Sequence, residues 1–223
     1  MAIGLASSVL ILVIAYLLGA TPTGYWTGRV LKGIDIREHG SKSIGATNVL
    51  RTLGKAPALF VLTIDILKGV AAIVLTRWLY TLPTLQTSPP LPLDQWVPWM
   101  VTLAGVAALL GHSKSIWINF TGGKSAATGL GILLAMAWQV GLGVLLTFVV
   151  LLALFRIVSL GSIAAAIAAP VLMVVFQQPL PYTLTALLGG LYVIWLHRAN
   201  IQRLLAGTEP QIGQKHREPN QTT

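Results

Sequence analysis

The sequence predicts an all-α integral membrane protein: one bundle of seven transmembrane helices, some of them short, with the N-terminus outside and the C-terminus in the cytoplasm. Three observations predict this class: the composition, the lengths of the uncharged runs and the placement of the cations. The 223 residues are 55% apolar and only 9% charged, whereas a soluble domain carries about 25% charged residues. The composition therefore excludes an ordinary water-soluble domain and a disordered chain alike.

The first three crossings follow from single apolar runs, because a spanning helix needs about 20 mostly apolar residues. Residues 2–28 contain no charge and form the first crossing. This run has neither a basic leader nor a small-residue cleavage site, so we expect it to be retained. Residues 56–76 form the second crossing and residues 95–110 a shorter third, with a Pro-rich loop between them.

Two longer uncharged runs follow. The run at 157–196 is interrupted by QQPLP at 177–181. It predicts two helices, since 40 residues of unbroken helix would measure about 60 Å against a hydrocarbon core of about 30 Å. The run at 125–155 has a weaker break at 138–141. Its length alone allows one long helix or two short ones.

The placement of the cations favours two helices in the run at 125–155. The chain carries 15 Lys and Arg against 6 Asp and Glu, a formal charge of +9, and cytoplasmic loops of membrane proteins are enriched in Lys and Arg. With seven crossings, thirteen of the fifteen cations lie inside, Arg77 lies outside and Lys68 lies within a helix. With six crossings, the basic C-terminal tail would move to the far side. The excess charge thus reports topology and not nucleic-acid binding.

The domain organisation predicted from this pattern is simple. Residues 1–206 form a single transmembrane domain, and the polar segment 207–223 forms a disordered cytoplasmic tail. The absence of cysteine excludes a disulfide framework, a thiolate metal site and a cysteine nucleophile. No spacing of His, Asp and Glu suggests a metal site.

The first inner loop combines small residues with neutral donors and one cation. Ser41, Thr47 and Asn48 supply hydroxyls and an amide among glycines, which let backbone N–H groups approach an anion. Arg51 follows Asn48 by three residues and could bind a phosphate with two parallel hydrogen bonds. The alternative is an ordinary interfacial loop with a helix cap.

The second inner loop places a glycine turn before an apolar run. Gly122, Gly123, Lys124 and Ser125 come directly before a predicted helix, whose N-terminus favours anions. The segment ends like a phosphate-binding P-loop, but Ile118 stands where that motif requires its first glycine, so a nucleotide site is rejected. The alternative is a plain helix start in which Lys124 extends towards the interface.

Two further inner segments carry polar residues at helical spacing. Ser159 and Ser162 lie at a helix–helix junction, where small residues commonly serve close packing. His197 and Asn200 lie three apart and share a helix face, for which an interfacial anchor is the alternative. Together with the two loops, these segments indicate a phosphorylated substrate at the cytoplasmic interface, with two basic glycine-containing loops for two phosphates.

One acid and one base fall within a predicted crossing. Asp65 and Lys68 lie three residues apart in the second apolar run. An intramembrane charge is costly unless it is paired. We therefore expect a structural ion pair that holds the bundle together, with no catalytic role.

Five segments resemble a known family. They are GSKSIGATNVLR at 40–51, DILKG at 65–69, GHSKSIWINFTGGKSAAT at 111–128, SLGSI at 159–163 and HRANIQRLLAGTEP at 197–210. In order and spacing they are similar to the bacterial acyl-phosphate:glycerol-3-phosphate acyltransferases, the PlsY family. The resemblance covers nearly the whole chain and implies seven transmembrane helices, in agreement with the cation count.

The resemblance implies a reaction and roles for the residues above. A fatty acyl group moves from acyl phosphate to the sn-1 hydroxyl of glycerol 3-phosphate, giving lysophosphatidic acid and phosphate, with no cofactor and no metal. Lys124, Arg51 and His197 would be the catalytic residues. The remaining substrate-binding residues would be Ser41, Thr47, Asn48, Gly122, Gly123, Ser125, Ser159, Ser162 and Asn200. His197 or the departing phosphate would accept the proton.

The resemblance also implies the localisation: the bacterial inner membrane, with an active site that faces the cytoplasm. The partners it implies are membrane lipids and the acyl-phosphate-producing enzyme, and no nucleic acid is expected. The sequence departs from the family pattern at Lys42, Ser43, Ser115, Ser125, Ala126 and Ala199. A small organophosphate or anion transporter is the rival interpretation, and it would need a cationic pathway that reaches the membrane midplane.

Overall fold

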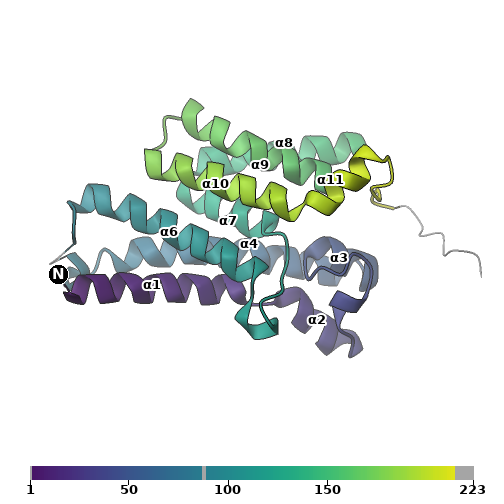
Figure 1. The fold of residues 1–223 in the computed structure, drawn as a ribbon, viewed down its shortest axis with the longest axis horizontal. Coiled ribbons are helices and arrows are strands. Elements are labelled where there is room, and N and C mark those ends of the chain that lie inside the picture. Colours follow the sequence, from purple (N-terminus) through teal and green to yellow (C-terminus); the bar gives the residue numbers. More distant parts are fainter. Residues whose placement is uncertain (1, 87–88, 214–223) are drawn as a thin grey trace, which may run out of the picture.

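The apolar helices run along the long axis of the molecule (Figure 1). The computed structural model describes residues 2–86 and 89–213. The apolar helices are α1 (Ala2–Ala20), α4 (Lys55–Leu79), α6 (Leu93–Ser113), α7 (Ala126–Met136), α8 (Trp138–Phe155), α9 (Val158–Val175) and α10 (Leu180–Leu196). Within the described ranges, five helical stretches are long and apolar enough to cross a membrane, and α10 with α11 adds a sixth if that pair, bent by 62°, counts as one span.

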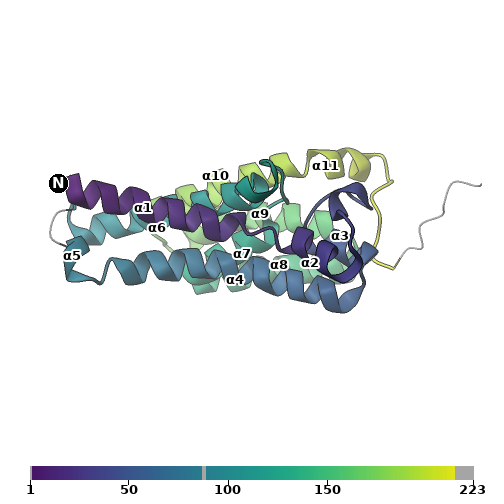
Figure 2. The same cartoon turned by 90° about the horizontal axis from the view of Figure 1, so that it is seen from below.

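Short helices gather at the end of the bundle opposite the N-terminus (Figures 1 and 2). They include α2, α3 and α11, whereas α5 lies at the end that carries the N-terminus (Figure 2). Of the residues singled out in the sequence, Thr47, Asn48 and Arg51 lie in α3 and Asn200 lies in α11. The short elements are α2 (Thr23–Lys32), η1 (Ile36–Glu38), α3 (Ala46–Thr52), α5 (Pro83–Gln86), η2 (Ile116–Ile118) and α11 (Arg198–Leu205). Of these, α3 and α11 are helices that the apolar pattern did not predict, because both are polar.

The predicted break in the run at 125–155 is confirmed, and the break lies at Ala137, between α7 and α8. The first apolar run is one candidate membrane span, Leu5–Lys32, but it is interrupted where α1 ends at Ala20 and α2 begins at Thr23. Pro22 lacks an N–H donor and disfavours helical backbone at the preceding residue, which explains this break. With 11 residues, α7 is about 16 Å long, roughly half of a hydrocarbon core.

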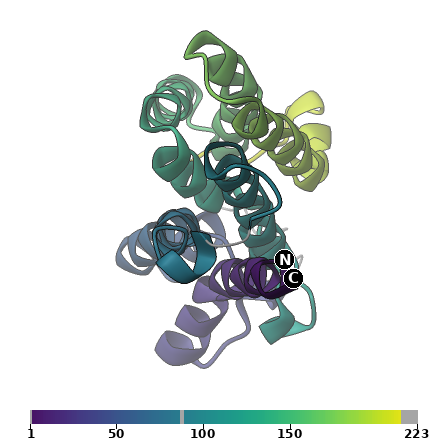
Figure 3. The same ribbon diagram turned by 90° about the vertical axis from the view of Figure 1, so that its left-hand side faces the viewer.

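Close helix packing surrounds this short helix. Helix α4 packs on α7, α1 on α6, and α9 on both α8 and α10; viewed along the bundle in Figure 3, purple α1 and the green helices occupy opposite sides. Gly69 of α4 lies against the backbone of Thr128, and Gly131 of α7 lies against the backbone of Ile66. Small residues of this kind let backbones approach and strengthen dispersion contacts, which replace the hydrophobic effect between helices in lipid.

Arg77 has a structural task that its predicted position outside the membrane did not suggest. Its guanidinium donates to the carbonyls of Ala135 at 2.6 Å and Met136 at 2.9 Å, and to the Tyr182 hydroxyl at 3.1 Å. The last carbonyls of a helix have no partner within the helix, and leaving them unpaired away from water is costly. Arg77 therefore caps the end of α7.

The start of the C-terminal tail is ordered, contrary to the prediction for 207–223. Glu209 is only 9% exposed, and the N–H of Ile212 donates to the Arg156 carbonyl at 2.8 Å. Residues 207–213 thus fold back against the helices, and Glu209 joins the site described next. The remainder of the predicted tail, 214–223, lies outside the described residues.

Candidate active site

A cavity of about 220 Å³ brings the inner segments together. Its polar end is lined by residues from both inner loops, from the start of α9 and from the junction of α10 with α11. The predicted site residues that line it are Ser41, Thr47, Asn48, Arg51, Lys124, Ser125, Ser159, Ser162, His197 and Asn200. The other end is apolar, with Ala165 and Ala169 of α9 facing Ala186 and Gly189 of α10.

Lys124 lies at the centre of the polar end, directly before α7. Its ammonium group donates to Asn200 Oδ1 at 2.5 Å. Burial lowers the pKa of Lys124, an effect that the nearby Glu209 carboxylate opposes. Ser125, Ala126 and Ala127 at the start of α7 also line the cavity. The first N–H groups of a helix lack intrahelical partners and carry the positive end of its dipole, so this corner suits an anion.

Glu209 is a site residue that the sequence-based site prediction missed. Its carboxylate accepts hydrogen bonds from Asn200 at 2.6 Å, Ser159 at 2.7 Å and Arg203 at 2.6 Å. Burial raises the pKa of this carboxyl, but the three donors outweigh burial and leave the pKa below its usual value. The sequence offered one sign of this role: Glu209 is the single acidic residue in the basic segment 197–210, the fifth of the segments that resemble the family.

His197 is held in one tautomer by its own helix. Its Nδ1 lies 2.7 Å from the Val193 carbonyl, which can only accept, so Nδ1 carries the proton and Nε2 keeps its lone pair. Burial is the main cause that lowers the pKa of His197 to about 4. The imidazole beyond the end of α10 is therefore neutral at physiological pH.

Asn48 and Arg51 share α3 but differ in what they contact. The Asn48 side chain is 1% exposed and makes four hydrogen bonds within the first inner loop. Its partners are the carbonyls of Ile36, His39 and Ser43 and the N–H of Ser41. Arg51 forms no hydrogen bond or ion pair with the residues that the structure describes. Asn48 thus shapes the loop, and its role in substrate binding stays a prediction, whereas the donors of Arg51 are not used by any described residue.

The glycine turn also differs from the prediction. Gly122 and Gly123 are not among the residues that line the cavity. The N–H of Gly123 donates to the His112 carbonyl at 3.0 Å, and a Cβ at either glycine would collide with His112 or Ser113. Their lack of a side chain serves close packing on the end of α6. The Ser125 hydroxyl is likewise occupied, donating to the Leu109 carbonyl at 2.9 Å.

Three departures from the family pattern have a structural consequence. Lys42 and Ser125 adopt φ of 57° and 60°, a left-handed conformation that costs a residue with a side chain roughly 1–2 kcal/mol. Both therefore stand where glycine is favoured. Ser115 donates through its hydroxyl to the Ala20 carbonyl at 2.5 Å and through its N–H to the Thr121 carbonyl at 3.1 Å. Proline at this position would lose both bonds.

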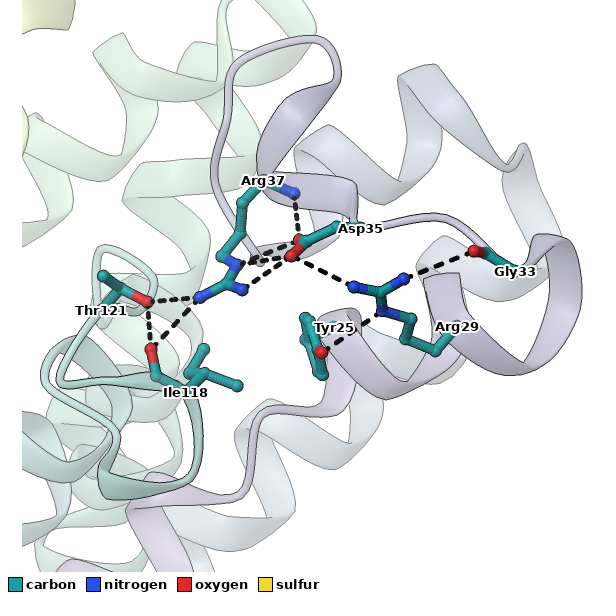
Figure 4. Close-up of polar contacts among 7 residues, drawn as sticks. All are labelled: Tyr25, Arg29, Gly33, Asp35, Arg37, Ile118 and Thr121. Carbon is teal, nitrogen blue, oxygen red and sulfur yellow. Dashed lines mark hydrogen bonds and ion pairs between the residues drawn. The ribbon is translucent and has the colours of Figure 1, made fainter.

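Arg37, which is ion-paired with Asp35 in the first inner loop, hydrogen-bonds to the second inner loop (Figure 4). Arg37 binds Asp35 at 2.6 Å and extends to the Ile118 carbonyl at 3.2 Å and the Thr121 hydroxyl at 3.0 Å. The hydrogen bonds from Arg37 hold the pKa of Asp35 below its ordinary value. The Arg37 guanidinium also lies over the Tyr25 ring, 4.9 Å from its centre. These contacts fix the distance between the loop that carries Arg51 and the loop that carries Lys124.

The predicted pair of Asp65 and Lys68 is present, with an ion-pair distance of 2.9 Å. Asp65 and His112 line the cavity beneath the glycine turn, whereas Lys68 lies behind them. Within the described part of the chain, no group of three His, Asp or Glu side chains could hold a metal ion.

Apolar helices around a cavity with a cationic end and an apolar end define an integral membrane protein built to bind an amphipathic, phosphorylated molecule. Comparison with known proteins makes the class specific. Residues 9–207 match the family model for glycerol-3-phosphate acyltransferase, and the chain belongs to this family.

Relatives and solved structures agree. The chain is 58% identical to the glycerol-3-phosphate acyltransferase of Acaryochloris marina, over 96% of each chain, and 63% identical to that of Trichormus variabilis, over 92% of each. Crystal structures of PlsY, an integral membrane glycerol 3-phosphate acyltransferase, superpose with a TM-score of 0.82 for the glycerol 3-phosphate form and 0.79 for the lysophosphatidic acid form. Both are 33% identical and cover 93% of this chain and 96% of the other.

Proposed function

We propose that this chain transfers a fatty acyl group from acyl phosphate to the sn-1 hydroxyl of glycerol 3-phosphate. The observation that carries the proposal is that Lys124 and Arg51 present unused N–H donors to one cavity whose other end is apolar. The cationic end suits two phosphates and the apolar end suits a fatty chain. The family assignment sets aside the transporter alternative.

The chemistry needs positioning more than activation, because acyl phosphate is a mixed anhydride. The glycerol hydroxyl oxygen attacks the acyl carbonyl carbon, the new ester C–O bond forms, and the bond from that carbon to the phosphate oxygen breaks. In our assignment, Ser41, Arg51 and Asn200 hold glycerol 3-phosphate, and Lys124 with the N–H groups that begin α7 holds the acyl-phosphate group. Fixed donors then stabilise the charge that develops on the carbonyl oxygen and on the leaving phosphate.

The departing phosphate is our proposed acceptor of the hydroxyl proton. His197, whose pKa burial lowers to about 4, is a weak base. Its Nε2 lone pair instead accepts a hydrogen bond from the glycerol hydroxyl and orients it. A His197→Ala variant whose pH–rate profile is scaled down without change of shape supports this role, whereas loss of an inflection identifies His197 as the base.

We infer that the site faces the cytoplasm of a bacterial inner membrane and that the chain crosses seven times, with α7 as a short crossing. Here the acyl-phosphate-producing enzyme can deliver the donor from the same side. Because the chain contains no cysteine, single cysteines report topology cleanly. A membrane-impermeant maleimide added to intact cells should label Gln177→Cys and not Lys114→Cys. The reverse pattern would invert the proposed orientation.

The decisive assay supplies the purified protein with acyl phosphate and labelled glycerol 3-phosphate, and with acyl-CoA as the competing donor. Lysophosphatidic acid is expected from acyl phosphate. Product formed from acyl-CoA but not from acyl phosphate would identify acyl-CoA as the acyl donor. No product from either donor would refute the proposed acyltransferase activity.

Arg51→Gln tests the glycerol 3-phosphate assignment. Loss of a bidentate phosphate contact should raise the KM for glycerol 3-phosphate about tenfold or more, with no change in thermal stability. An unchanged KM would remove Arg51 from this role.

A further inference from the structure

The buried Lys68 side chain contacts groups on α4, on α6 and on the segment after α1. Its side chain is 5% exposed, and Asp65 beside it is 3% exposed. The ammonium nitrogen lies 2.9 Å from Asp65 Oδ1, 2.7 Å from His112 Nδ1 and 3.1 Å from the Thr21 carbonyl. An ammonium group has three N–H donors and no acceptor. Lys68 is hydrogen-bonded to His112 of α6 and to the segment after α1, and it is ion-paired with Asp65 of α4, so partners from three segments surround the ammonium group.

This arrangement determines the state of His112. Because the Lys68 ammonium only donates, the Nδ1 atom of His112 presents its lone pair, and the ring proton lies on Nε2. Asp65 lies farther away, 3.8 Å from Nδ1. The imidazole is therefore held in one orientation and one tautomer by Lys68.

The fixed ring supports the glycine turn. A Cβ on Gly123 would lie 2.9 Å from Cε1 and 3.0 Å from Cδ2 of His112 and closer still to Nε2, so the tip of the ring rests directly on Gly123. The backbone of the same histidine accepts the Gly123 N–H at 3.0 Å. Gly123 immediately precedes Lys124, so a rotation of the His112 ring would displace the backbone that aims the Lys124 side chain.

We propose that Lys68 is a positioning residue that acts through His112 to set the glycine turn, and thereby the binding of acyl phosphate by Lys124. The inference rests on the proposed function and adds to it. The Asp65–Lys68 pair then does more than hold the bundle together. The KM for glycerol 3-phosphate, which we assign to Ser41, Arg51 and Asn200, should change little when Lys68 or His112 is replaced.

Two variants test the proposal without leaving a buried charge unpaired. Asp65→Asn combined with Lys68→Met removes both charges at once and frees the His112 ring. His112→Asn keeps an acceptor near the position of Nδ1, so Lys68 stays satisfied, but removes the ring tip from Gly123. Each should raise the KM for acyl phosphate about tenfold while the KM for glycerol 3-phosphate stays within about twofold.

Thr76→Val is the matched control, because Thr76 is buried in the same helix and, among the described residues, its hydroxyl bonds only to the Ala72 carbonyl at 2.7 Å; neither KM should change. If the double variant does not fold, His112→Asn decides alone. An unchanged KM for acyl phosphate in folded His112→Asn, or an equal rise in both KM values, would overturn the proposal. Inactive wild-type protein would instead refute the proposed function, so the two failures are distinguishable.

Discussion

Lys124 lines the cavity, whereas Lys68 is not among the lining residues but pairs with Asp65 and His112, which are; the surroundings of the two lysines differ in one further respect. Lys68 is hydrogen-bonded to two groups within 3.1 Å and ion-paired with Asp65 at 2.9 Å. Lys124 has a single protein acceptor among the described residues, Asn200 Oδ1, so two of its three N–H donors remain for a ligand. In our assignment, unused hydrogen-bonding capacity, more than charge itself, separates the lysine that supports the fold from the lysine proposed to bind substrate.

The same distinction divides the first inner loop. The Asn48 side-chain amide makes four hydrogen bonds within the loop. The Arg51 side chain makes no hydrogen bond with the described residues. The sequence groups both residues in one anion-binding motif. Their separate roles become visible only when each donor and acceptor is assigned a partner.

Lys124→Met is expected to have the largest effect. Removing the cation that faces the donor phosphate should lower kcat/KM by about 10³-fold, roughly 4 kcal/mol of transition-state stabilisation, with little change in thermal stability. The measurement is lysophosphatidic acid formation, and Lys114→Met, an exposed cation of the same loop, is the control. If Lys124→Met keeps more than about a tenth of wild-type activity, Lys124 is not the cation that binds the donor phosphate, and the distinction drawn between Lys68 and Lys124 is wrong.

His197 should make stability depend on pH. Its folded pKa of about 4 lies below the ordinary 6.5, so the unfolded chain binds a proton first. Stability from this group is complete above pH 6.5 and is lost as the pH falls towards 4, by up to about 3 kcal/mol. Unfolding midpoints between pH 7 and pH 4.5 should fall less steeply for His197→Gln than for wild type. The exposed His39→Gln variant should follow wild type, and equal slopes for all three would contradict the assignment.

Asn48→Ala should act on stability first. It strands three carbonyls and one N–H in a buried loop, at a cost of about 2 kcal/mol, and should lower the unfolding midpoint. Arg51→Gln from the same helix should leave the midpoint unchanged. Equal unfolding midpoints for Asn48→Ala and Arg51→Gln would show that a residue with all its hydrogen bonds formed contributes no more to stability than a residue with none.

Lys42→Gly should have the smallest effect. Lys42 holds φ at 57°, so glycine relieves strain, but glycine also gains entropy in the unfolded chain; the net gain should be no more than about 1 kcal/mol. Gly40→Ala is the opposite control, because Gly40 has φ of 54° and a Cβ there would collide with Asn48. A loss of stability in Lys42→Gly would mean that the lysine makes a compensating contact.

Much of the architecture was predictable because spanning helices have a strong composition signal. The break in the run at 125–155 follows from the placement of the cations, and the ion pair of Asp65 with Lys68 follows from spacing along a helix. His197 and Asn200 both line the cavity, but His197 lies at the bend between α10 and α11 and not on one helix with Asn200. The helices α3 and α11 were not predictable from apolar runs, since they are polar and depend on their partners. Glu209 was missed because a polar tail gives no sign that it folds back over a cavity.

By itself, the sequence determined the membrane class, the helical runs and the set of polar side chains at one end of the bundle, because these depend on local composition and on charge placement. Only the tertiary structure decided which of those side chains are saturated and which remain available. Lys68 and Ser125 have partners from other segments and Asn48 has partners within its own loop, whereas Lys124 and Arg51 keep donors that no described residue uses. Hydrogen-bond partners far apart in the chain are set by packing, and packing is not encoded in local spacing.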